Sequence, residues 1–391
     1  MRIALVTETF LPSVDGVVTR LTHAVDWLAA HGHDLAVVAP DLGVTDYHGV
    51  PVLGVPAATM PVYRSRKWGL PTPAVARHLA AFSPDVVHVW QPDLVGLAAV
   101  GGCRHHGWPL VTSYHTDTVG YLDYYGPLRA IRRPAVWYER RLHNSAPLTL
   151  VTSRAMARTL EARGVERVAV LPRGVDLETR SPSFASPDMR ARLTSGHPER
   201  PLIVFVGRLA AEKSLETLAP VARTHPEWAF ALVGDGPARA GLEEAFAGTG
   251  ATFTGFLSGE ELAAAFACAD AFAFPSTSET LGLVILEAQA SGTPVVAAQS
   301  PATAEQLSDG VNGLVYDPAD AGALEAALTR LLAKTDDGAR LRVRLRAAGL
   351  AEAQANGWDR ASAALLDAYD LTLGAYSLGW RAPEHPGRAR A

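Results

Sequence analysis

The chain has 391 residues, of which 48 % are hydrophobic and 19 % are charged, and its net charge is −5. This length predicts two or three domains, and the apolar content excludes intrinsic disorder. The negative charge argues against a general nucleic-acid-binding protein, which is usually basic, and we expect no nucleic-acid partner. Cys103 and Cys268 are far apart, which excludes a disulfide framework or zinc ribbon and is typical of a reducing cytosol.

Short apolar runs alternate with helical patterns almost throughout the chain. In the first half, strands are expected at 2–8, 34–39, 85–90, 110–115 and 148–153. The same alternation restarts at 201–207 and continues through 228–234, TFTGF, DAFAFP and TPVVAA. Strands without polar alternation, separated by helices, are typical of a parallel sheet that is covered on both faces. The sequence therefore predicts two doubly wound α/β domains.

The expected domain boundaries are 1–178 and 199–357. The segment between the two series, 176–200, is rich in Ser, Pro and charged residues and is interpreted as the linker. A further helix is expected to begin after Gly357 and to cover about 358–376, and 377–391 is expected to be a tail. Periodicity does not reveal what this helix packs against. In open sheets of this class, ligands bind beyond the carboxyl ends of the strands.

The strongest motif is FVGRLAAEKSLE, which follows the first strand of the second domain. Gly207 permits a tight turn after that strand, and Arg208 and Lys213 follow it. Two cations at the end of a parallel strand, beside a helix N-terminus, are suited to binding a diphosphate. The alternative interpretation is a pair of solvated surface cations.

The second motif is FPSTSETLGLVILEAQASGTPVV. Glu279 follows a loop of small hydroxyl residues, Gly282 opens a helix, and Glu287 lies inside that helix. We expect both carboxylates near the positive end of the helix dipole, where they could accept hydrogen bonds from sugar or ribose hydroxyls. The alternative is that Glu279 caps the helix and that Glu287 is an ordinary helical residue.

A third candidate is His115, at the end of the strand 110–115. Its neighbours Tyr114, Thr116 and Asp117 make this strand end unusually polar, which favours a functional site. The alternative is a buried histidine whose hydrogen bonds are satisfied within the core. We expect the role of His115 to be positional rather than that of a general base.

Together these motifs resemble the family-4 glycosyltransferases of GT-B fold, over nearly the whole chain. The resemblance rests on the order and spacing of Asp15-Gly16-Val17, His115 in SYHTD, PRGVD at 172–176, GRLAAEK, GDGPAR at 234–239, and the pair Glu279 and Glu287. It implies two Rossmann-like domains facing a central cleft, with the last helix returning to the first domain. It also implies that the anomeric configuration of the sugar is retained.

The resemblance also implies a role for each motif residue. The position of Gly16 brings backbone close to the donor phosphate, and those of Arg208 and Lys213 bind the diphosphate. The position of Glu287 holds the donor ribose, that of Glu279 contacts the sugar, and that of His115 lies near the anomeric centre. Leu283, directly after Gly282, is included in the predicted donor site. The predicted catalytic set is therefore His115, Glu279, Arg208 and Lys213, and the predicted donor-binding set is Gly16, Arg208, Lys213, Glu279, Leu283 and Glu287.

The predicted chemistry needs no metal and no cofactor. The sequence shows no evident DxD-like acidic pair at a strand end, and positioned cations with a helix N-terminus can stabilise a departing diphosphate. No carboxylate is obviously placed as a nucleophile. We therefore favour same-face attack, in which the departing phosphate helps to deprotonate the acceptor; a trapped covalent sugar on Glu279 or Asp117 would overturn this hypothesis.

The acceptor is predicted to be a lipid or glycolipid at an anionic membrane surface. Two segments of the first domain, 126–146 and 61–71, combine basic and aromatic residues, which suits an anionic bilayer. These residues are Arg129, Arg132, Arg133, Trp137, Tyr138, Arg140 and Arg141 in the first segment and Arg64, Arg66, Lys67 and Trp68 in the second. The alternative is an ordinary solvated helix face and loop.

The predicted function is transfer of a hexose from a nucleotide sugar to a hydroxyl of a membrane lipid or glycolipid, by a cytoplasmic enzyme peripheral on the inner face of the cell membrane. Within the family, the chain resembles bacterial GDP-mannose-dependent α-mannosyltransferases and sulfoquinovosyl- or glucosyl-diacylglycerol synthases, and its PRGVD motif is more similar to the mannosyltransferases. This resemblance implies GDP-mannose as the donor in preference to a UDP-hexose. The alternatives are a soluble sugar or polysaccharide acceptor, a nucleotide-sugar epimerase, a glycogen-synthase-like polymerase, or a non-catalytic partner subunit. A nicotinamide dehydrogenase would require a G-x-G-x-x-G motif, which neither domain has at the required place.

Overall fold

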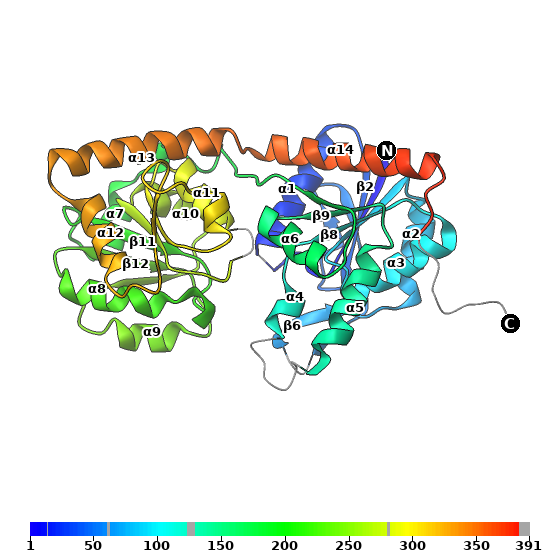
Figure 1. The fold of residues 1–391 in the computed structure, drawn as a ribbon, viewed down its shortest axis with the longest axis horizontal. Helices are drawn as coiled ribbons and strands as arrows, with labels where there is room; N and C mark the ends of the chain where they lie inside the picture. Colours follow the sequence, from blue (N-terminus) through cyan, green and yellow to red (C-terminus); the bar gives the residue numbers. More distant parts are fainter. Residues whose placement is uncertain (14, 61–62, 123–129, 280–281, 383–391) are drawn as a thin grey trace. The chain divides into compact units, whose positions relative to one another are not determined.

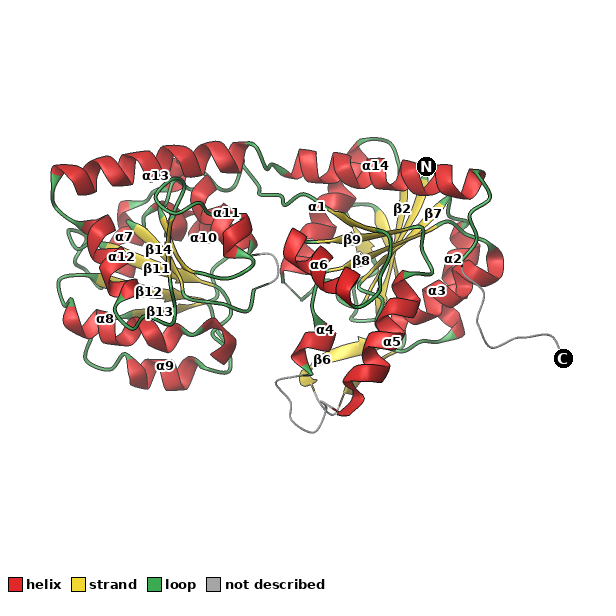
Figure 2. Cartoon of the chain, viewed as in Figure 1, coloured by secondary structure: helices red, strands yellow, loops and turns green. Residues whose placement is uncertain are grey.

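The computed structural model describes residues 1–391 except 14, 61–62, 123–129, 280–281 and 383–391. The chain forms two compact units. Unit 1 consists of Met1–Pro172 with Trp358–Ala391, and unit 2 consists of Arg173–Gly357. Each unit has a largely parallel sheet with helices on both faces (Figure 1, Figure 2).

Unit 1 contains an 8-stranded sheet in the order β10-β9-β8-β7-β1-β2-β4-β3. Its strands are β1 (Arg2–Thr7), β2 (Asp34–Pro40), β3 (Asp46–Tyr47), β4 (Val50–Val55), β7 (Val86–Trp90), β8 (Leu110–Tyr114), β9 (Leu148–Val151) and β10 (Val168–Val170). β3 pairs antiparallel with β4, and the other pairs are parallel. β1 therefore lies between β2 and β7, where the strand order reverses direction.

Two helical layers cover this sheet because β1 is apolar on both faces. Leu5 packs in a cluster with α1 and α14, whereas Val6 packs in a cluster with α2 and α3. The helices of unit 1 are α1 (Gly16–Ala30), α2 (Pro73–Phe82), α3 (Leu94–His106), α4 (Thr118–Tyr121), α5 (Arg132–His143), α6 (Arg154–Ala162) and α14 (Trp358–Ser377).

The C-terminal helix α14 belongs to unit 1, as the sequence resemblance implied. Leu365, Ala368 and Tyr369 are buried in the same cluster as Ile3 and Leu5 of β1. At the start of α14, the indole of Trp358 stacks on the ring of His23 in α1, with centroids 4.7 Å apart. The chain thus returns to the domain in which it began.

The segment from 57 to 69 forms a β-hairpin that the sequence analysis did not predict. β5 (Ala57–Met60) pairs antiparallel with β6 (Tyr63–Gly69) in a separate 2-stranded sheet. Residues 61–71, which overlap this hairpin, are predicted from the sequence to form a basic and aromatic surface. Lys67 is exposed, but Trp68 is partly buried, and the side chains of Arg64 and Arg66 lie outside the described part of the structure.

Unit 2 contains a 6-stranded sheet in the order β13-β12-β11-β14-β15-β16. Its strands are β11 (Leu202–Val206), β12 (Ala229–Val233), β13 (Thr252–Gly255), β14 (Ala271–Phe274), β15 (Val295–Ala298) and β16 (Leu314–Tyr316). Numbered within the unit, this order is 3-2-1-4-5-6, which is the order of dinucleotide-binding Rossmann domains. The topological switch point lies between β11 and β14.

Helices cover both faces of this sheet as well. Phe205 of β11 packs in the cluster that includes α8, α9, α12 and α13, whereas Val204 packs in the cluster that includes α7, α10 and α11. The helices are α7 (Pro187–Leu193), α8 (Leu218–Thr224), α9 (Arg239–Ala245), α10 (Gly259–Ala267), α11 (Leu283–Ala290), α12 (Ala323–Leu332) and α13 (Asp336–Gln354), with short 3-10 turns at η2 (Pro182–Phe184), η3 (Ala211–Lys213), η4 (Leu215–Thr217) and η5 (Thr303–Glu305).

The segment interpreted as a linker contributes to unit 2. It contains η2 and α7, and Met189 and Leu193 of α7 are buried against strands β11 and β12. Arg190 donates to the Asp270 carboxylate at 2.7 Å, which fastens α7 to the residue before β14. The segment 176–200 is rich in Ser and Pro because Ser181 and Ser186 cap η2 and α7, and a proline follows each cap.

Candidate active site

The predicted donor-binding residues of unit 2 gather at the topological switch point. Arg208 and Lys213 follow β11, and Glu279 follows β14, its neighbour in the sheet. Because the carboxyl ends of parallel strands share one edge, the two loops meet there. The hydroxyls of Ser276 and Ser278 both donate to the backbone carbonyl of Glu212, at 3.3 and 3.1 Å, and fasten the second loop onto the first.

Glycines allow the loops after β11 and β12 to touch backbone to backbone. A Cβ atom on Gly234 would lie 1.9 Å from the carbonyl oxygen of Gly207, and one on Gly236 would lie 2.3 Å from that of Leu209. Leu209 in turn donates its amide to the Asp235 carbonyl at 3.0 Å. The GRL and GDG motifs are therefore one packed structure, and a side chain at either glycine would displace the other loop.

Lys213 and Glu279 form an ion pair between Nζ and Oε2. Both side chains are largely buried, with exposed fractions of 15 % and 23 %. Glu279 also packs against Gly282, the N-cap of α11, where φ is +62°. This pair lies at the expected place, beside the start of a helix, and its buried setting strengthens charge-assisted contacts.

Arg208 is more exposed than Lys213, with 48 % of its side chain accessible, and it pairs with Glu212, four residues further along the chain. An exposed ion pair of this kind contributes little to stability and is readily exchanged for another anion. Arg208 can therefore change partners, whereas Lys213 is held in a fixed place by Glu279.

Glu287 lies in the middle of α11, so its carboxylate is not at the positive end of the helix as expected. It pairs instead with Arg180, whose Nε lies 3.2 Å from Oε1. Burial raises the pKa of the Glu287 carboxyl and Arg180 opposes that rise. Arg180 lies in the segment interpreted as a linker, so sequence reasoning missed it. Leu283 is the first residue of α11 and is partly buried.

Gly16 and His115, the two remaining predicted residues, belong to unit 1. Gly16 is the exposed first residue of α1, beyond the carboxyl end of β1. The Asp15 side chain caps this helix by accepting the amides of Val17 and Val18, each at 3.0 Å. The DGV motif is therefore a helix start, and its glycine leaves the first turn uncovered by a side chain.

His115 follows β8, and its ring is buried. It stacks on the Trp90 indole with ring centroids 4.8 Å apart and an interplanar angle of 3°. Its Nε2 lies 2.8 Å from the hydroxyl of Ser113, and its amide donates to the Gln91 side chain at 2.9 Å. Burial lowers the pKa of His115 well below its usual value, and Arg20 and His88 lower it further. The ring is therefore neutral and held in one orientation.

Asp117, which also follows β8, has a structural partner. Both of its carboxylate oxygens accept from Arg163, at 2.8 and 2.9 Å, in a bidentate ion pair. Burial raises the pKa of the Asp117 carboxyl, but the hydrogen bonds from Arg163 and Gly120 outweigh it, and the net shift is downward. Tyr114 and Glu139 complete this network, which fastens the end of β8 to α5 and α6.

Two acidic residues at the switch point of unit 1 were not singled out from the sequence. Glu8 follows β1 and accepts the amide of Gly96 at 2.9 Å, and Asp93 precedes α3 after the neighbouring strand β7. Burial raises the pKa of Glu8 to about 8 and that of Asp93 to about 7, and the nearby Asp93 carboxyl also raises that of Glu8. Within the described residues, no group of three or more His, Cys, Asp or Glu side chains is arranged to hold a metal ion.

Comparison with known families identifies the chain. The family model described as "Glycosyltransferase Family 4" matches residues 14–179, and that described as "Glycosyl transferases group 1" matches residues 200–334. A GDP-mannose-dependent alpha-mannosyltransferase of Mycolicibacterium smegmatis is 36 % identical over 385 residues, which are 97 % of this chain and 99 % of that protein. The chain belongs to the family-4 glycosyltransferases. It is a glycosyltransferase.

Two further relatives extend this comparison. The sulfoquinovosyl transferase SQD2 of Arabidopsis thaliana is 37 % identical over 342 residues, which are 84 % of this chain and 66 % of that protein. The solved structure of sucrose-phosphate synthase from Thermosynechococcus elongatus superposes with a TM-score of 0.76 at 23 % identity, over 96 % of this chain and 99 % of that one. The family-4 glycosyltransferase described here therefore has the GT-B fold, as predicted.

The basic and aromatic surface predicted for 126–146 is present on part of α5. Arg133, Trp137 and Arg140 are exposed along one face of this helix, and Ile131 is exposed just before it. Tyr138 does not belong to this surface, because its hydroxyl donates to the Asp93 carbonyl at 3.1 Å. Arg129 lies outside the described residues. No helix in the described part of the chain is both long and apolar enough to cross a bilayer.

Proposed function

We propose that this glycosyltransferase transfers a hexose, with retention of configuration, from a nucleotide sugar to a hydroxyl of a membrane lipid or glycolipid. GDP-mannose is the favoured donor, because the relative that covers almost this entire chain is named for GDP-mannose-dependent mannosyl transfer. The observation that carries the proposal is the pairing of Lys213 and Glu279 at the switch point of unit 2. This pairing supports the proposal because an ammonium group suits a diphosphate and a carboxylate suits sugar hydroxyls.

In this proposal, Arg208 and Lys213 bind the donor diphosphate. Lys213 supplies a held ammonium group, and Arg208 exchanges Glu212 for a phosphate oxygen. Glu279 accepts hydrogen bonds from the sugar, and Glu287 accepts them from the ribose while Arg180 orients its carboxylate. Gly16 admits the diphosphate to the start of α1, and Leu283 contacts the nucleotide. Since two cations face the leaving group, transfer proceeds without a metal ion or cofactor.

The sugar is attacked from the side on which the diphosphate departs. Asp117 is an unsuitable nucleophile because Arg163 occupies both of its oxygens, and Glu279 is paired with Lys213. The departing phosphate then accepts the acceptor proton. A glycosyl adduct on either carboxylate, found by mass spectrometry of the intact protein after incubation with donor alone, would contradict this mechanism.

The donor specificity is tested by calorimetric titration of the protein with GDP-mannose, UDP-glucose, UDP-galactose and UDP-sulfoquinovose in the presence of EDTA. We expect GDP-mannose to bind most tightly and EDTA to leave its affinity unchanged. Tighter binding of a UDP-sugar would move the assignment to that hexose. A requirement for Mg²⁺ would overturn the metal-independent mechanism.

The acceptor is proposed to be reached from the cytoplasmic face of an anionic membrane, with α5 against the bilayer. Trp137 is 52 % exposed and Ile131 is 50 % exposed, and the exposed residues Arg133 and Arg140 lie before and after Trp137. The Arg141 guanidinium lies 5.7 Å from the Trp137 ring centroid. Indole rings prefer the level of lipid headgroups, and each basic residue near an anionic surface contributes about 1 kcal/mol of attraction.

Sedimentation with vesicles tests this membrane contact. The chain should bind vesicles that contain anionic phosphatidylglycerol more tightly than neutral ones, and Trp137→Ala with Arg133→Ala should reduce binding about tenfold or more. Arg192→Ala with Val343→Ala, two exposed positions in unit 2, is the matched control. Equal binding to both vesicle types would favour the alternative of a soluble sugar or polysaccharide acceptor.

A further inference from the structure

A chain of four buried polar groups connects the C-terminal helix to His115. The hydroxyl of Tyr369 in α14 lies 2.9 Å from His88 Nδ1, and His88 Nε2 lies 3.0 Å from the hydroxyl of Ser113. The same hydroxyl lies 2.8 Å from His115 Nε2. All four side chains are at least 95 % buried, and all belong to unit 1.

The two histidines of this hydrogen-bonded series, His88 and His115, are neutral, so each ring carries one N–H. Burial lowers the pKa of His88 to about 3 and that of His115 well below its usual value. Ser113 has a single hydroxyl proton, and among the described residues its hydroxyl oxygen contacts the Nε2 atoms of these two rings and nothing else. Ser113 must therefore donate to one ring and accept from the other.

Tyr369 decides between the two directions. Its hydroxyl is fully buried, and in the described part of the chain His88 Nδ1 is the one hydrogen-bond partner that it has. If His88 Nδ1 carried the proton, the Tyr369 proton would be buried without an acceptor. Leaving a buried donor unsatisfied disfavours that arrangement by about 5- to 150-fold. The Tyr369 hydroxyl therefore donates to His88 Nδ1.

The remaining protons follow from this first one. Since His88 Nδ1 accepts, its Nε2 carries the proton and donates to Ser113. The Ser113 hydroxyl then donates to His115 Nε2, which leaves the proton of the neutral His115 ring on Nδ1. Each step uses the distances above and requires no group from outside unit 1.

We propose that Tyr369, His88 and Ser113 are positioning residues that hold His115 in the Nδ1–H tautomer, so that His115 acts on the substrate as a hydrogen-bond donor and not as a base. This inference rests on the proposed function, which makes His115 part of the active site. It also gives α14 a role besides packing, because the helix that returns from unit 2 delivers the hydroxyl that sets the tautomer.

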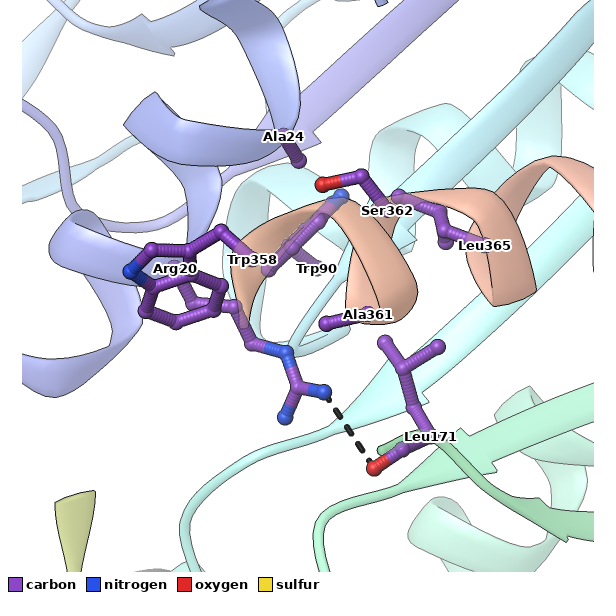
Figure 3. Close-up of a pocket in the computed structure, with 8 residues that line it drawn as sticks. All are labelled: Arg20, Ala24, Trp90, Leu171, Trp358, Ala361, Ser362 and Leu365. Carbon is purple, nitrogen blue, oxygen red and sulfur yellow. Dashed lines mark hydrogen bonds between the residues drawn. The ribbon is translucent and has the colours of Figure 1, made fainter. Parts of the chain in front are cut away.

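The surroundings of His115 fix the ring as well as its proton. Trp90 stacks on it at an interplanar angle of 3°, and Gln91 holds its backbone amide. Trp90 itself lines a small pocket between α1 and α14, together with Arg20 and Trp358 (Figure 3). A change in the position of α14 would therefore alter the surroundings of His115 through two residues, Trp90 and Tyr369.

The tautomer is measured directly by ¹⁵N nuclear magnetic resonance of the histidine rings in the full chain. The His115 signals are those that disappear in His115→Gln. In the unsubstituted protein we expect a protonated Nδ1 and an unprotonated Nε2 for His115. In Tyr369→Phe, which removes the hydroxyl alone, we expect averaged shifts from a mixture of tautomers. Tyr376→Phe removes a hydroxyl that lies in the same helix but does not belong to the hydrogen-bonded series, and it should leave the His115 shifts unchanged.

A second variant keeps the test decisive if Tyr369→Phe folds poorly. Ser113→Ala should release the His115 tautomer, and Ser113→Thr, which restores the hydroxyl, should recover it. A protonated Nε2 on His115 in the unsubstituted protein would overturn the proposal. So would a Tyr369→Phe variant and a Ser113→Ala variant that both fold and both keep the Nδ1–H tautomer.

Kinetics separate this proposal from the proposed function. Where Tyr369→Phe mixes the tautomers, we expect kcat to fall about tenfold with the donor KM unchanged, because a transition-state contact is lost. An unchanged kcat despite mixed tautomers would overturn the role of His115 as a donor. Absence of transfer by the unsubstituted protein, with the Nδ1–H tautomer in place, would overturn the proposed function and leave the proton arrangement standing.

Discussion

Lys213 and Glu279 form an ion pair across the topological switch point of unit 2, between the loops that follow β11 and β14. The two side chains are 66 residues apart in the sequence and are both largely buried. A cation assigned to the donor diphosphate is therefore already held by the carboxylate assigned to the donor sugar. Substitutions of Lys213 and of Glu279 should therefore have different effects on diphosphate binding and on the rate of sugar transfer.

Replacing Glu279 by Gln should leave nucleoside diphosphate binding intact or make it tighter, because the Lys213 ammonium no longer shares its charge with a carboxylate. Turnover should fall by a factor on the order of 10² to 10³, the usual loss when one group that stabilises a transition state is removed. Calorimetric affinity for GDP and initial transfer rates measure the two effects. Parallel loss of both would show that Glu279 maintains the loop and does not act on the sugar.

Replacing Lys213 by Met should weaken diphosphate binding by about 1.5–3 kcal/mol, the contribution of a charge-assisted hydrogen bond. Arg208→Ala should have an effect of the same direction, whereas Glu212→Gln should strengthen binding because Arg208 loses its competing carboxylate. Arg192→Ala removes a surface cation from the same unit and serves as the control. Affinities that do not differ from that control would place the diphosphate elsewhere.

Replacing Gly234 by Ala should damage the donor loops through a direct collision. The new Cβ would lie 1.9 Å from the Gly207 carbonyl oxygen, in a residue whose φ is +137°. Gly248→Ala places a Cβ at a positive φ with no atom within 4 Å, so it isolates the conformational cost. We expect Gly248→Ala to cost about 1 kcal/mol of unfolding free energy and Gly234→Ala to cost about 1–3 kcal/mol more, measured by urea denaturation. Equal costs would mean that the loops separate freely.

Glu8 should contribute a fall in stability as the pH rises from about 5 to 8, opposite in sign to the contribution of buried neutral histidines such as His88 below pH 6.5. Its carboxyl has a pKa of about 8 in the folded protein and about 4.5 as its ordinary value, so the folded state retains a proton that the unfolded state loses. Such a group decreases the unfolding free energy by up to about 1.4 kcal/mol per pH unit in this range. Glu8→Gln keeps an acceptor for the Gly96 amide and carries no charge. Relative to the unsubstituted protein, Glu8→Gln should gain stability as the pH rises from about 5 to 8, whereas Glu161→Gln at an exposed site, the control, should not; an unchanged pH dependence in Glu8→Gln would contradict the burial argument.

The alternation of apolar strands and helices sufficed to predict the two doubly wound domains and most of their strands, but not β3, β4, β10 and β16. The family was predicted from the order and spacing of the motifs. Each expected strand is present, since runs such as 202–206 and 229–233 are apolar on both faces and can be stable only inside a parallel sheet. Arg208, Lys213 and Glu279 came together for the same reason, because residues that follow adjacent parallel strands share one edge. The short hairpin of β5 and β6 escaped prediction, because its sequence mixes small, basic and aromatic residues without the regular alternation of apolar and polar residues that marks a strand.

Partners that are distant in sequence could not be predicted in this way. Arg180 pairs with Glu287 across 107 residues, and Tyr369 reaches His88 across 281 residues. Neither pair has a spacing or a local composition that would mark its two residues as partners. The hydrogen bonds of Asp117 to Arg163 likewise depend on the packing of α6 beside β8. Sequence patterns therefore predicted the candidate site residues. The residues that orient them could be identified only from the tertiary structure.

The central claim, hexose transfer from a nucleotide sugar to a membrane lipid, is tested most directly by following the sugar. The purified chain is incubated with a membrane lipid extract, EDTA and radiolabelled GDP-mannose, and label is counted in the organic phase, with Lys213→Met as the inactive control. The account predicts organic-phase label that depends on Lys213 and not on added metal. Release of GDP with label confined to water-soluble sugars would contradict the lipid acceptor.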